Sequence, residues 1–270
     1  MTLGKYAGAT DTGRTRRRNE DSYVVAPPLF CVADGMGGAQ AGEVASKLAA
    51  AAVEEVDPGG LAGPERLTAL IQEANRRVYD RAAADPTVSG MGTTMTVALV
   101  EDGDVTFGHV GDSRAYRVRD GRLEQVTEDH SLVNELVKSG KLSREEAETH
   151  PQRSVITRAL GTDPDVDVDA FTVDTSPGDL FLLCSDGLSS MIDGDEILAL
   201  VQHNREDLKA TAKSLLNAAN RGGGEDNITV VLFEIAEDGA DTLTMPALDT
   251  AVLPAQQDPP ERKHRWGRVH

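Results

Sequence analysis

The sequence predicts an α+β sandwich in which helices cover stacked antiparallel β-sheets. Between residues 95 and 126, apolar side chains alternate with period two, and Asp102-Gly103 and Asp120-Gly121 offer tight turns between successive runs. Connections this short join antiparallel strands. Between residues 44 and 78, by contrast, apolar side chains recur with helical spacing in two consecutive stretches, which indicates a helix pair.

The first half of the chain supplies an isolated strand, the helix pair and the meander. Residues 29–33 form a short apolar run that precedes Asp34-Gly35, so we predict a buried strand that ends there. Residues 44–56 carry apolar side chains in adjacent i, i+4 rows, and residues 67–78 carry a second such stripe. The predicted strands of the meander are 95–99, 105–109, 115–119 and 123–126.

The second half alternates polar and apolar segments. Residues 130–160 are polar and contain Pro151, and we interpret them as an inserted flap that is partly helical. Residues 180–184 repeat the pattern of an apolar strand before an Asp-Gly pair, here Asp186-Gly187. A third long helix is predicted over 208–219, and 228–235 are apolar on both faces, as in a central strand. The folded domain is therefore predicted to span residues 1–236.

Composition excludes several classes of protein. The 270 residues include 45 acidic and 27 basic side chains, and the net charge of −18 repels the phosphates of nucleic acids. No apolar run reaches the roughly 20 residues that span a bilayer. Residues 1–6 show no secretion signal, and two cysteines, Cys31 and Cys184, make no disulfide framework. We expect a monomeric cytoplasmic protein.

The last segment, residues 237–270, differs from the rest. It holds four of the twelve prolines and no sustained periodicity, so we interpret it as a disordered tail. A short imperfect repeat places Thr242 and Thr250 three positions before an apolar residue. The repeat is typical of a low-complexity linker. The alternative is that a kinase phosphorylates these threonines and a phosphothreonine-reading domain docks there.

Four aspartates lie at the ends of predicted strands. Asp34 and Asp186 follow apolar runs, Asp226 precedes the last strand, and Asp112 lies between two strands. Any one of them is typical of a turn or a helix cap. Taken jointly, with glycines beside them that allow close approach, they suggest a site for a hard divalent cation, Mg²⁺ or Mn²⁺.

Six short motifs follow one another along the chain. They are Asp11-x-Gly13-x-x-Arg16-x-x-Asn19-Glu20-Asp21, Asp34-Gly35-Met36-Gly37-Gly38, Gly92-Thr93-Thr94, Gly108-His109-Val110-Gly111-Asp112-Ser113-Arg114, Ser185-Asp186-Gly187 and Asp226-Asn227-Ile228-Thr229. Each motif alone is weak, whereas six at these separations are specific and cover nearly the whole body. In this order they resemble one family, the metal-dependent protein phosphatases or protein phosphatase 2C family, in its bacterial form.

The resemblance implies a four-layer αββα sandwich, the hydrolysis of phosphoserine and phosphothreonine in proteins, and two to three Mn²⁺ or Mg²⁺ ions. The implied partners are phosphorylated proteins, namely bacterial Ser/Thr kinases and their substrates. The resemblance also implies the metal ligands: Asp34 bridges two ions, the Gly35 carbonyl binds the first, and Asp186 and Asp226 bind the second. Asp112 with Asp186 binds a third ion. Glu20 and Asp21 orient the metal-bound waters from behind, and Arg16 binds the phosphate.

The charges make the implied chemistry coherent. A phosphoester and these carboxylates are both anionic, so bound cations are needed to bring them together. A water that bridges two cations becomes a hydroxide nucleophile and attacks phosphorus in line, with no phosphoenzyme. Animal members carry a histidine as proposed proton donor where this chain has Met36. His150 in the flap and a metal-bound water are alternative donors, and His150 is also typical of a surface histidine.

Two other functions fit parts of the pattern. A non-catalytic relative that binds phosphoproteins would be expected to have lost metal carboxylates, whereas this chain keeps all those that match. A phosphohydrolase acting on small molecules would share the metal chemistry. Phosphopeptide turnover, compared with turnover of a sugar-phosphate panel, separates this last alternative from a protein phosphatase.

Overall fold

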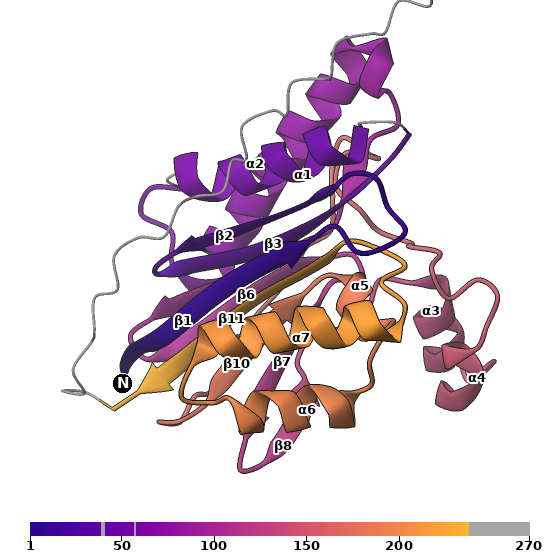
Figure 1. Ribbon diagram of the computed structural model, residues 1–270. Helices are drawn as coiled ribbons and strands as arrows, with labels where there is room; N and C mark the ends of the chain where they lie inside the picture. The colour runs from indigo at the N-terminus through magenta and orange to yellow at the C-terminus, as the bar shows by residue number, and fades with distance from the viewer. Residues whose placement is uncertain (39–40, 57, 238–270) are drawn as a thin grey trace, which may run out of the picture.

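The computed structural model describes residues 1–38, 41–56 and 58–237. Within them the chain forms two antiparallel sheets that stack face to face (Figure 1). The first sheet contains, in spatial order, β1 (Thr2–Asp11), β11 (Ile228–Ala236), β10 (Leu180–Cys184), β7 (Arg114–Arg119) and β8 (Arg122–Gln125). The second contains β2 (Asp21–Ala26), β3 (Leu29–Met36), β5 (Met95–Glu101), β6 (Asp104–Val110) and β9 (Asp169–Val173), and β4 (Gly92–Thr93) pairs with the end of β3.

Helix pairs cover both outer faces of the sandwich. The pair α1 (Ala41–Glu55) and α2 (Gly63–Ala84) packs on the second sheet, and α6 (Gly194–His203) and α7 (Leu208–Gly222) lie over the first (Figure 1). A short 3₁₀ turn, Pro86–Val88, follows α2, and α5 (Asp186–Ser189) follows β10. The predicted four-layer αββα sandwich is therefore the observed architecture.

The flap stands off one end of the sandwich. Its helices α3 (Leu132–Lys138) and α4 (Arg144–Glu148) project beyond the sheets beside α5 (Figure 1). Ser131 caps α3, and Ser143 caps α4 in a capping box with Glu146. A bridge between Ser131 and Ile156 closes the base of the flap. The interpretation of residues 130–160 as a partly helical insertion matches these elements.

Stacked aromatic rings hold the two sheets together. Phe30 of β3 and Phe233 of β11 stack with ring centroids 4.5 Å apart, and Phe181 of β10 lies 5.2 Å from Phe233. All three rings are fully buried. Because this core joins both sheets, it fixes the relative position of the strand ends that carry the acidic residues.

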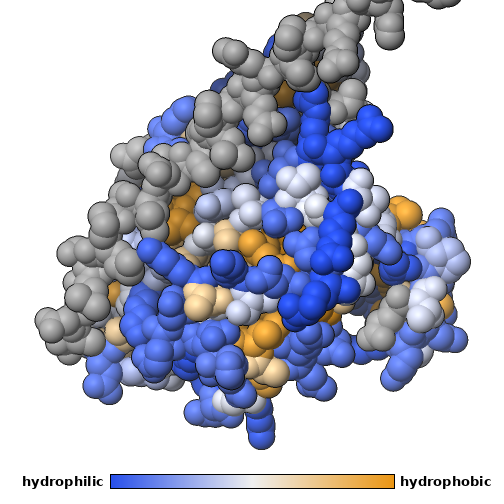
Figure 2. Space-filling model, in the orientation of Figure 1, coloured by the Kyte–Doolittle hydropathy of each residue, from blue (hydrophilic) through white to orange (hydrophobic). Residues whose placement is uncertain are grey.

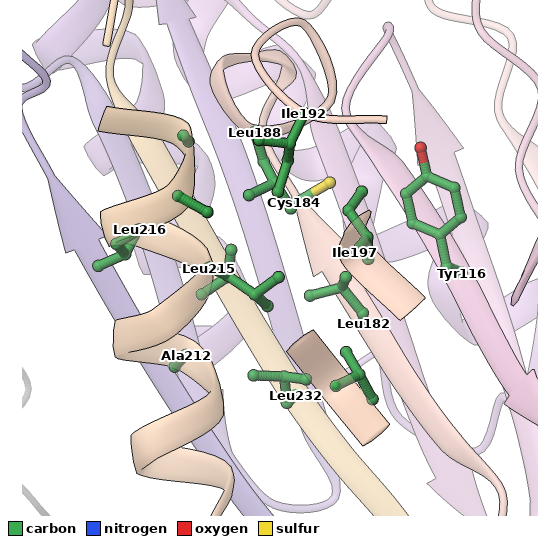
Figure 3. Close-up of a cluster of buried hydrophobic side chains, with 14 of the residues drawn as sticks. Tyr116, Leu182, Cys184, Leu188, Ile192, Ile197, Ala212, Leu215, Leu216 and Leu232 are labelled. Atoms are coloured by element: carbon green, nitrogen blue, oxygen red, sulfur yellow. The ribbon is translucent and has the colours of Figure 1, made fainter. Parts of the chain in front are cut away.

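A second core lies between the first sheet and its helices. Leu215 of α7 points toward Leu232 of β11 and Leu182 of β10, as Figure 3 shows, and all three are fully buried. Asp207 begins the helix, since its carboxylate accepts hydrogen bonds from the Lys209 and Ala210 amides. This packing and the Asp207 cap hold α7 against β11.

Several elements differ from the sequence-based expectations. The edge strand β1 was not predicted, because its side chains are mostly half-exposed and it contains Gly8, which faces the Tyr23 ring of β2. Strands β2 and β9 and helix α6 were not predicted either, although α6 places the buried Ile197 and Val201 at helical spacing behind an Asp193 cap. The strand β3 does not end before Asp34 but continues to Met36, because Gly35 and Met36 pair with β4.

The surface of the described residues is largely polar. Figure 2 shows hydrophilic side chains over most of the visible coloured face. No helix in the described ranges is long and apolar enough to cross a membrane. The tail over 237–270, with Thr242 and Thr250, lies outside the described residues except for its first position, so its predicted disorder and docking role stay predictions.

Substitution of Leu215 by Ala should destabilise the protein by about 2–5 kcal/mol, because a fully buried leucine leaves a cavity between α7 and the sheet. Urea unfolding measures the loss. Leu61→Ala is the matched control, since Leu61 is 41% exposed and should cost no more than about 0.5 kcal/mol. Equal losses for the two variants would contradict this packing.

Candidate metal centre

The acidic residues of both sheets meet at the end of the sandwich that carries the flap. Asp21 and Asp34 are cross-strand partners on β2 and β3 of the second sheet. Asp186 follows β10, and Asp226 precedes β11, of the first sheet. The loop between β6 and β7 brings Asp112 toward Asp186, whose charge acts on it. Segments more than 200 residues apart thus contribute to one centre.

Close backbone packing fixes Asp34 and Gly35. The Asp34 amide donates to Thr94 Oγ1 (3.0 Å), and the Asp34 carbonyl accepts from the Thr94 amide (2.9 Å). A Cβ on Gly35 would lie 2.1 Å from the Gly42 carbonyl oxygen in the first turn of α1. Glycine is therefore required at position 35, because the backbone of α1 approaches the strand directly.

A second glycine contact joins Asp186 to Asp226. A Cβ on Gly187 would lie 2.0 Å from the carbonyl oxygen of Asn227. The two backbones can touch only because residue 187 lacks a side chain. Burial raises the pKa of Asp186, and the charge of the nearby Asp226 acts in the same direction.

Asn227 anchors the arginine-rich loop beside the centre. Its Oδ1 accepts from the Glu20 amide (2.7 Å), and its Nδ2 donates to the carbonyls of Thr12 and Arg18 (2.9 Å each). Sequence reasoning assigned Asn227 no role. Its place directly after Asp226 was the available signal, but the partners lie about two hundred residues away and are visible only in the fold.

Asp21 lies behind the centre in a buried hydroxyl network. Its Oδ2 accepts from Ser185 Oγ (2.8 Å) and Thr229 Oγ1 (2.6 Å), and its Oδ1 is buried with no hydrogen-bond partner among the described residues. Burial raises the pKa of Asp21 to about 7, although both hydroxyls oppose this. Sequence reasoning quoted Ser185 and Thr229 within motifs but gave them no function.

Asp112 is a buried carboxyl with a free oxygen atom. It is 8% exposed, and its Oδ1 has no hydrogen-bond partner in the described part of the chain. Burial raises its pKa to about 7, and the charge of Asp186 acts in the same direction. The neighbouring Ser113 Oγ lies 2.8 Å from Thr94 Oγ1, so the threonine that holds Asp34 also holds this loop.

Asp34 is the most crowded carboxyl of the group. Burial raises its pKa well above the ordinary value, and the charges of Asp21, Asp186, Asp112 and Asp226 add to the effect. Deprotonated carboxyls this close repel one another strongly unless cations lie between them. The arrangement therefore favours either shared protons or bound metal.

The donor set fits hard divalent cations. Carboxylate and carbonyl oxygens are the ligands that Mg²⁺ and Mn²⁺ prefer, and the partnerless Oδ1 of Asp112 is one available ligand atom. In the described ranges, however, no group of three or more His, Cys, Asp or Glu side chains is arranged so that it could hold a metal ion as it stands. Asp226 is instead paired with Arg16.

Arg16 lies against a candidate metal ligand. Its Nη2 is 2.6 Å from Asp226 Oδ2, and half of its side chain is exposed. The loop that carries it is fixed by the Arg14 and Thr15 amides, which donate to the Gly224 carbonyl (2.8 and 3.2 Å). The predicted contact of Arg16 with phosphate stays a prediction.

Glu20 and Met36 flank the centre. Glu20 is half-buried, and burial raises the pKa of its carboxyl, with the charge of Arg16 acting in the opposite direction. Its carbonyl accepts from the Gly35 amide (3.2 Å), which ties it to the candidate first-ion ligand. Met36 ends β3, where its thioether cannot donate a proton.

The remaining candidates have local, structural surroundings. His150 lies two residues beyond α4, and its Nδ1 accepts from the Gln152 amide (3.2 Å), as in a turn at a helix end. Cys31 and Cys184 are buried free thiols inside strands. Burial raises the pKa of Cys184 to about 12, which suppresses the reactive thiolate.

A cleft of about 920 Å³ opens between the flap and the body. Asp112 and Asp186 line it together with residues of α3 and of the segment from α5 to α6. The flap adds Lys138, Arg144 and Arg153 to its wall. The acidic centre is thus reached along a groove lined by both acidic and basic side chains.

The fold and the acidic centre together define a metal-dependent α+β enzyme. The profile of the family described as protein phosphatase 2C matches residues 14–229. The serine/threonine phosphatase stp of Listeria welshimeri is 40% identical over 236 residues, which cover 83% of this chain and 93% of that protein. The serine/threonine protein phosphatase PstP of Mycobacterium tuberculosis is 41% identical over 238 residues, 86% of this chain and 45% of PstP.

Solved structures agree with these matches. A crystal structure of the M. tuberculosis phosphatase PstP/Ppp has a TM-score of 0.82 and 39% identity, covering 87% of this chain and all of the solved chain. The catalytic domain of PstP, solved with two manganese ions, gives a TM-score of 0.79 and 37% identity, covering 87% of this chain and 99% of the solved chain. The chain belongs to the protein phosphatase 2C family, and the predicted family, sandwich fold, enzyme class and Mn²⁺ or Mg²⁺ dependence are confirmed.

The metal-free protein should lose stability as the pH rises between about 4 and about 7, because folding raises the pKa of Asp112 and its folded form holds the proton longer than its unfolded form. Asp112→Asn removes this titration. In chelator, we compare the free energy of unfolding of the variant with that of wild type. The difference should shift in favour of the variant by at least about 1 kcal/mol between about pH 5 and about pH 8. A difference that is constant over this range would contradict the raised pKa.

Proposed function

We propose that this chain hydrolyses phosphoserine and phosphothreonine in proteins, and that Asp34, Gly35, Asp186 and Asp226 hold the two cations that the reaction needs. The observation that carries this proposal is the meeting of carboxyls from both sheets around the half-buried Asp34, where the charges of Asp21, Asp186, Asp112 and Asp226 all act on it and call for cations. The family and the manganese-containing relative support it.

Each ligand has a separate part. Asp34 lies on β3, where the charges of four other aspartates act on it, so it suits a ligand shared by both ions. The carbonyl of Gly35 would complete the protein ligands of the first ion. Asp186 and Asp226, joined through Gly187, serve the second ion. When bound, the cations supply the positive charge that attracts the phosphate and a lowered pKa for the attacking water.

The remaining acidic residues surround this pair of ions. Asp112 with Asp186 serves a third, weaker ion, for which the partnerless Oδ1 of Asp112 is available. Asp21 and Glu20 lie behind the ligands, where their carboxylates orient waters of the ions. Asp21 is fixed for this role by the hydroxyls of Ser185 and Thr229.

Arg16 binds the substrate phosphate in this proposal. Its exposed guanidinium lies 2.6 Å from Asp226, so it can release that carboxylate to a cation and turn to a phosphate at the same place. A planar guanidinium matches two phosphate oxygens at once. The negative charge that develops in the transition state is then shared between Arg16 and the cations.

The cleft beneath the flap suits a peptide substrate. It leads to Asp112 and Asp186 and is open enough to hold residues that flank the phosphorylated side chain. The proposed substrates are phosphorylated Ser/Thr kinases and the proteins that they modify. We further propose that residues 1–236 form the catalytic domain and act as a cytoplasmic monomer.

Removal of metal should abolish turnover. Activity on a phosphothreonine peptide should vanish in EDTA and return with Mn²⁺ or Mg²⁺, because the carboxylates alone repel the substrate. Asp34→Ala should lower kcat at least about 1,000-fold and abolish tight Mn²⁺ binding, since it removes the shared ligand. Asp104→Ala, an exposed aspartate on β6, is the control. Full activity in chelator would refute the mechanism, and turnover of sugar phosphates alone would refute the substrate class.

Substitution of Arg16 by Ala should raise the KM for a phosphopeptide by about 10-fold and lower kcat less, because Arg16 binds phosphate in the ground state as well as in the transition state. Arg17→Ala changes a neighbouring exposed arginine and should leave both constants within about twofold. Steady-state kinetics at saturating Mn²⁺ give both values. An unchanged KM for Arg16→Ala would remove Arg16 from phosphate binding.

A further inference from the structure

His130 lies at the base of the flap and holds the loop that carries Asp112. It is 8% exposed. Its backbone amide donates to the Gly111 carbonyl (2.8 Å), and the Gly111 amide donates to His130 Nδ1 (3.0 Å). The two residues thus exchange a pair of hydrogen bonds. The peptide group before Gly111 is thereby held by the His130 ring, and the next one, immediately before Asp112, is held by the His130 backbone amide.

Gly111 has no side chain with which to fix itself. Its φ of +115° lies where side chains are rarely tolerated. A Cβ there would lie 2.5 Å from the Cβ of Thr94. The loop therefore depends on partners from outside, and His130 is the partner on its N-terminal side. On the C-terminal side, Ser113 bonds Thr94 (2.8 Å).

The hydrogen bonds define the tautomer of His130. Because Nδ1 accepts from an amide, the ring proton is on Nε2 in the neutral ring. Nε2 lies 3.1 Å from Asp169 Oδ2 and donates to it. Arg158 Nη1 donates its two protons to Asp169 Oδ1 (2.7 Å) and to the Asp167 carbonyl (3.2 Å); it also lies 3.0 Å from His130 Nε2, to which it does not donate in this tautomer. One imidazole therefore joins the Asp112 loop to a fixed ion pair.

The same residue joins the flap to this arrangement. The Thr157 amide donates to the His130 carbonyl (2.8 Å), and the Leu132 amide, which begins α3, donates to the Val155 carbonyl (2.9 Å). His109 of β6 packs on the His130 ring with centroids 4.8 Å apart. His109 Nε2 is itself 3.1 Å from the Glu128 carbonyl. The ring of His130 is consequently held on its edges and on one face.

We propose that His130 is a positioning residue that aims Asp112 at the third cation, by accepting the Gly111 amide through Nδ1, and that it couples this ion site to the base of the flap. The proposal rests on the proposed function of Asp112. Loss of the Nδ1 acceptor leaves the Gly111 amide buried without its partner, and the loop then relaxes away from the geometry that the ion needs. The Nε2 bond to Asp169 orients the ring.

Two conservative variants test the two ring nitrogens of His130 separately. In His130→Asn, the amide oxygen replaces Nδ1 and keeps the acceptor for Gly111, but the contact with Asp169 is lost. In His130→Gln, the longer side chain replaces Nε2 and keeps the contact with Asp169, but the acceptor for Gly111 is lost. His203→Gln, at the exposed C-terminal end of α6, is the control for a remote histidine.

The readout is Mn²⁺ binding by calorimetry, together with kcat and KM for a phosphopeptide. His130→Gln should retain two tight Mn²⁺ ions, weaken the weakest site at least about 10-fold and lower kcat with little change in KM, as Asp112→Ala should. His130→Asn should stay within about threefold of wild type for the weakest site. Equal effects of the two variants, or an unchanged weakest site in His130→Gln, would overturn the proposal.

Failure of the proposed function gives a different result. A wild-type protein without Mn²⁺-dependent phosphatase activity would refute the proposed function. If the wild type is active but His130→Asn and His130→Gln bind Mn²⁺ equally well, only the role of His130 is refuted. If His130→Gln does not fold, ¹⁵N spectra of the wild-type histidines decide. His130 should be neutral, with its proton on Nε2, at about pH 7. A proton on Nδ1 would overturn the proposal, because Nδ1 could not then accept from Gly111.

Discussion

Burial and the charges of neighbouring carboxylates raise the pKa of both Asp34 and Asp186, although the two residues come from different sheets. Each carboxyl alone is expensive to bury, and bringing them together adds a Coulombic cost. A divalent cation between them converts this repulsion into attraction. The affinity of the centre for metal and its ability to receive an anionic phosphate therefore have the same origin, the forced proximity of these carboxyls.

The fold keeps the carboxyls together against this repulsion. Phenylalanine rings between the sheets fix how the strand ends face each other, and Gly35 and Gly187 let neighbouring backbones touch beside Asp34 and Asp186. Asn227 ties the loop of Arg16 to Asp226. The main chains that carry the proposed ligands are thus fixed by packing and backbone hydrogen bonds, and in our proposal cations displace only side-chain partners such as Arg16.

Much of this centre is predictable from sequence, because its ligands lie in short motifs whose order and spacing are visible along the chain. The long helices and the central strand β11 are predictable from their apolar patterns. The edge strand β1 is not, since its side chains are half-exposed and Gly8 makes room for Tyr23. Nor are the contacts of Asn227 and His130, because hydrogen bonds between distant segments leave no local pattern in the sequence.

The central claim is that cations bind between the half-buried carboxyls of both sheets. Anomalous diffraction from crystals grown with Mn²⁺ tests it most directly, because it locates manganese independently of activity. Two strong peaks are expected, one contacted by Asp34 and the Gly35 carbonyl and the other by Asp34, Asp186 and Asp226, with a weaker peak at Asp112. Manganese found only elsewhere, or no peak between Asp34 and Asp186 at saturating Mn²⁺, would contradict the claim.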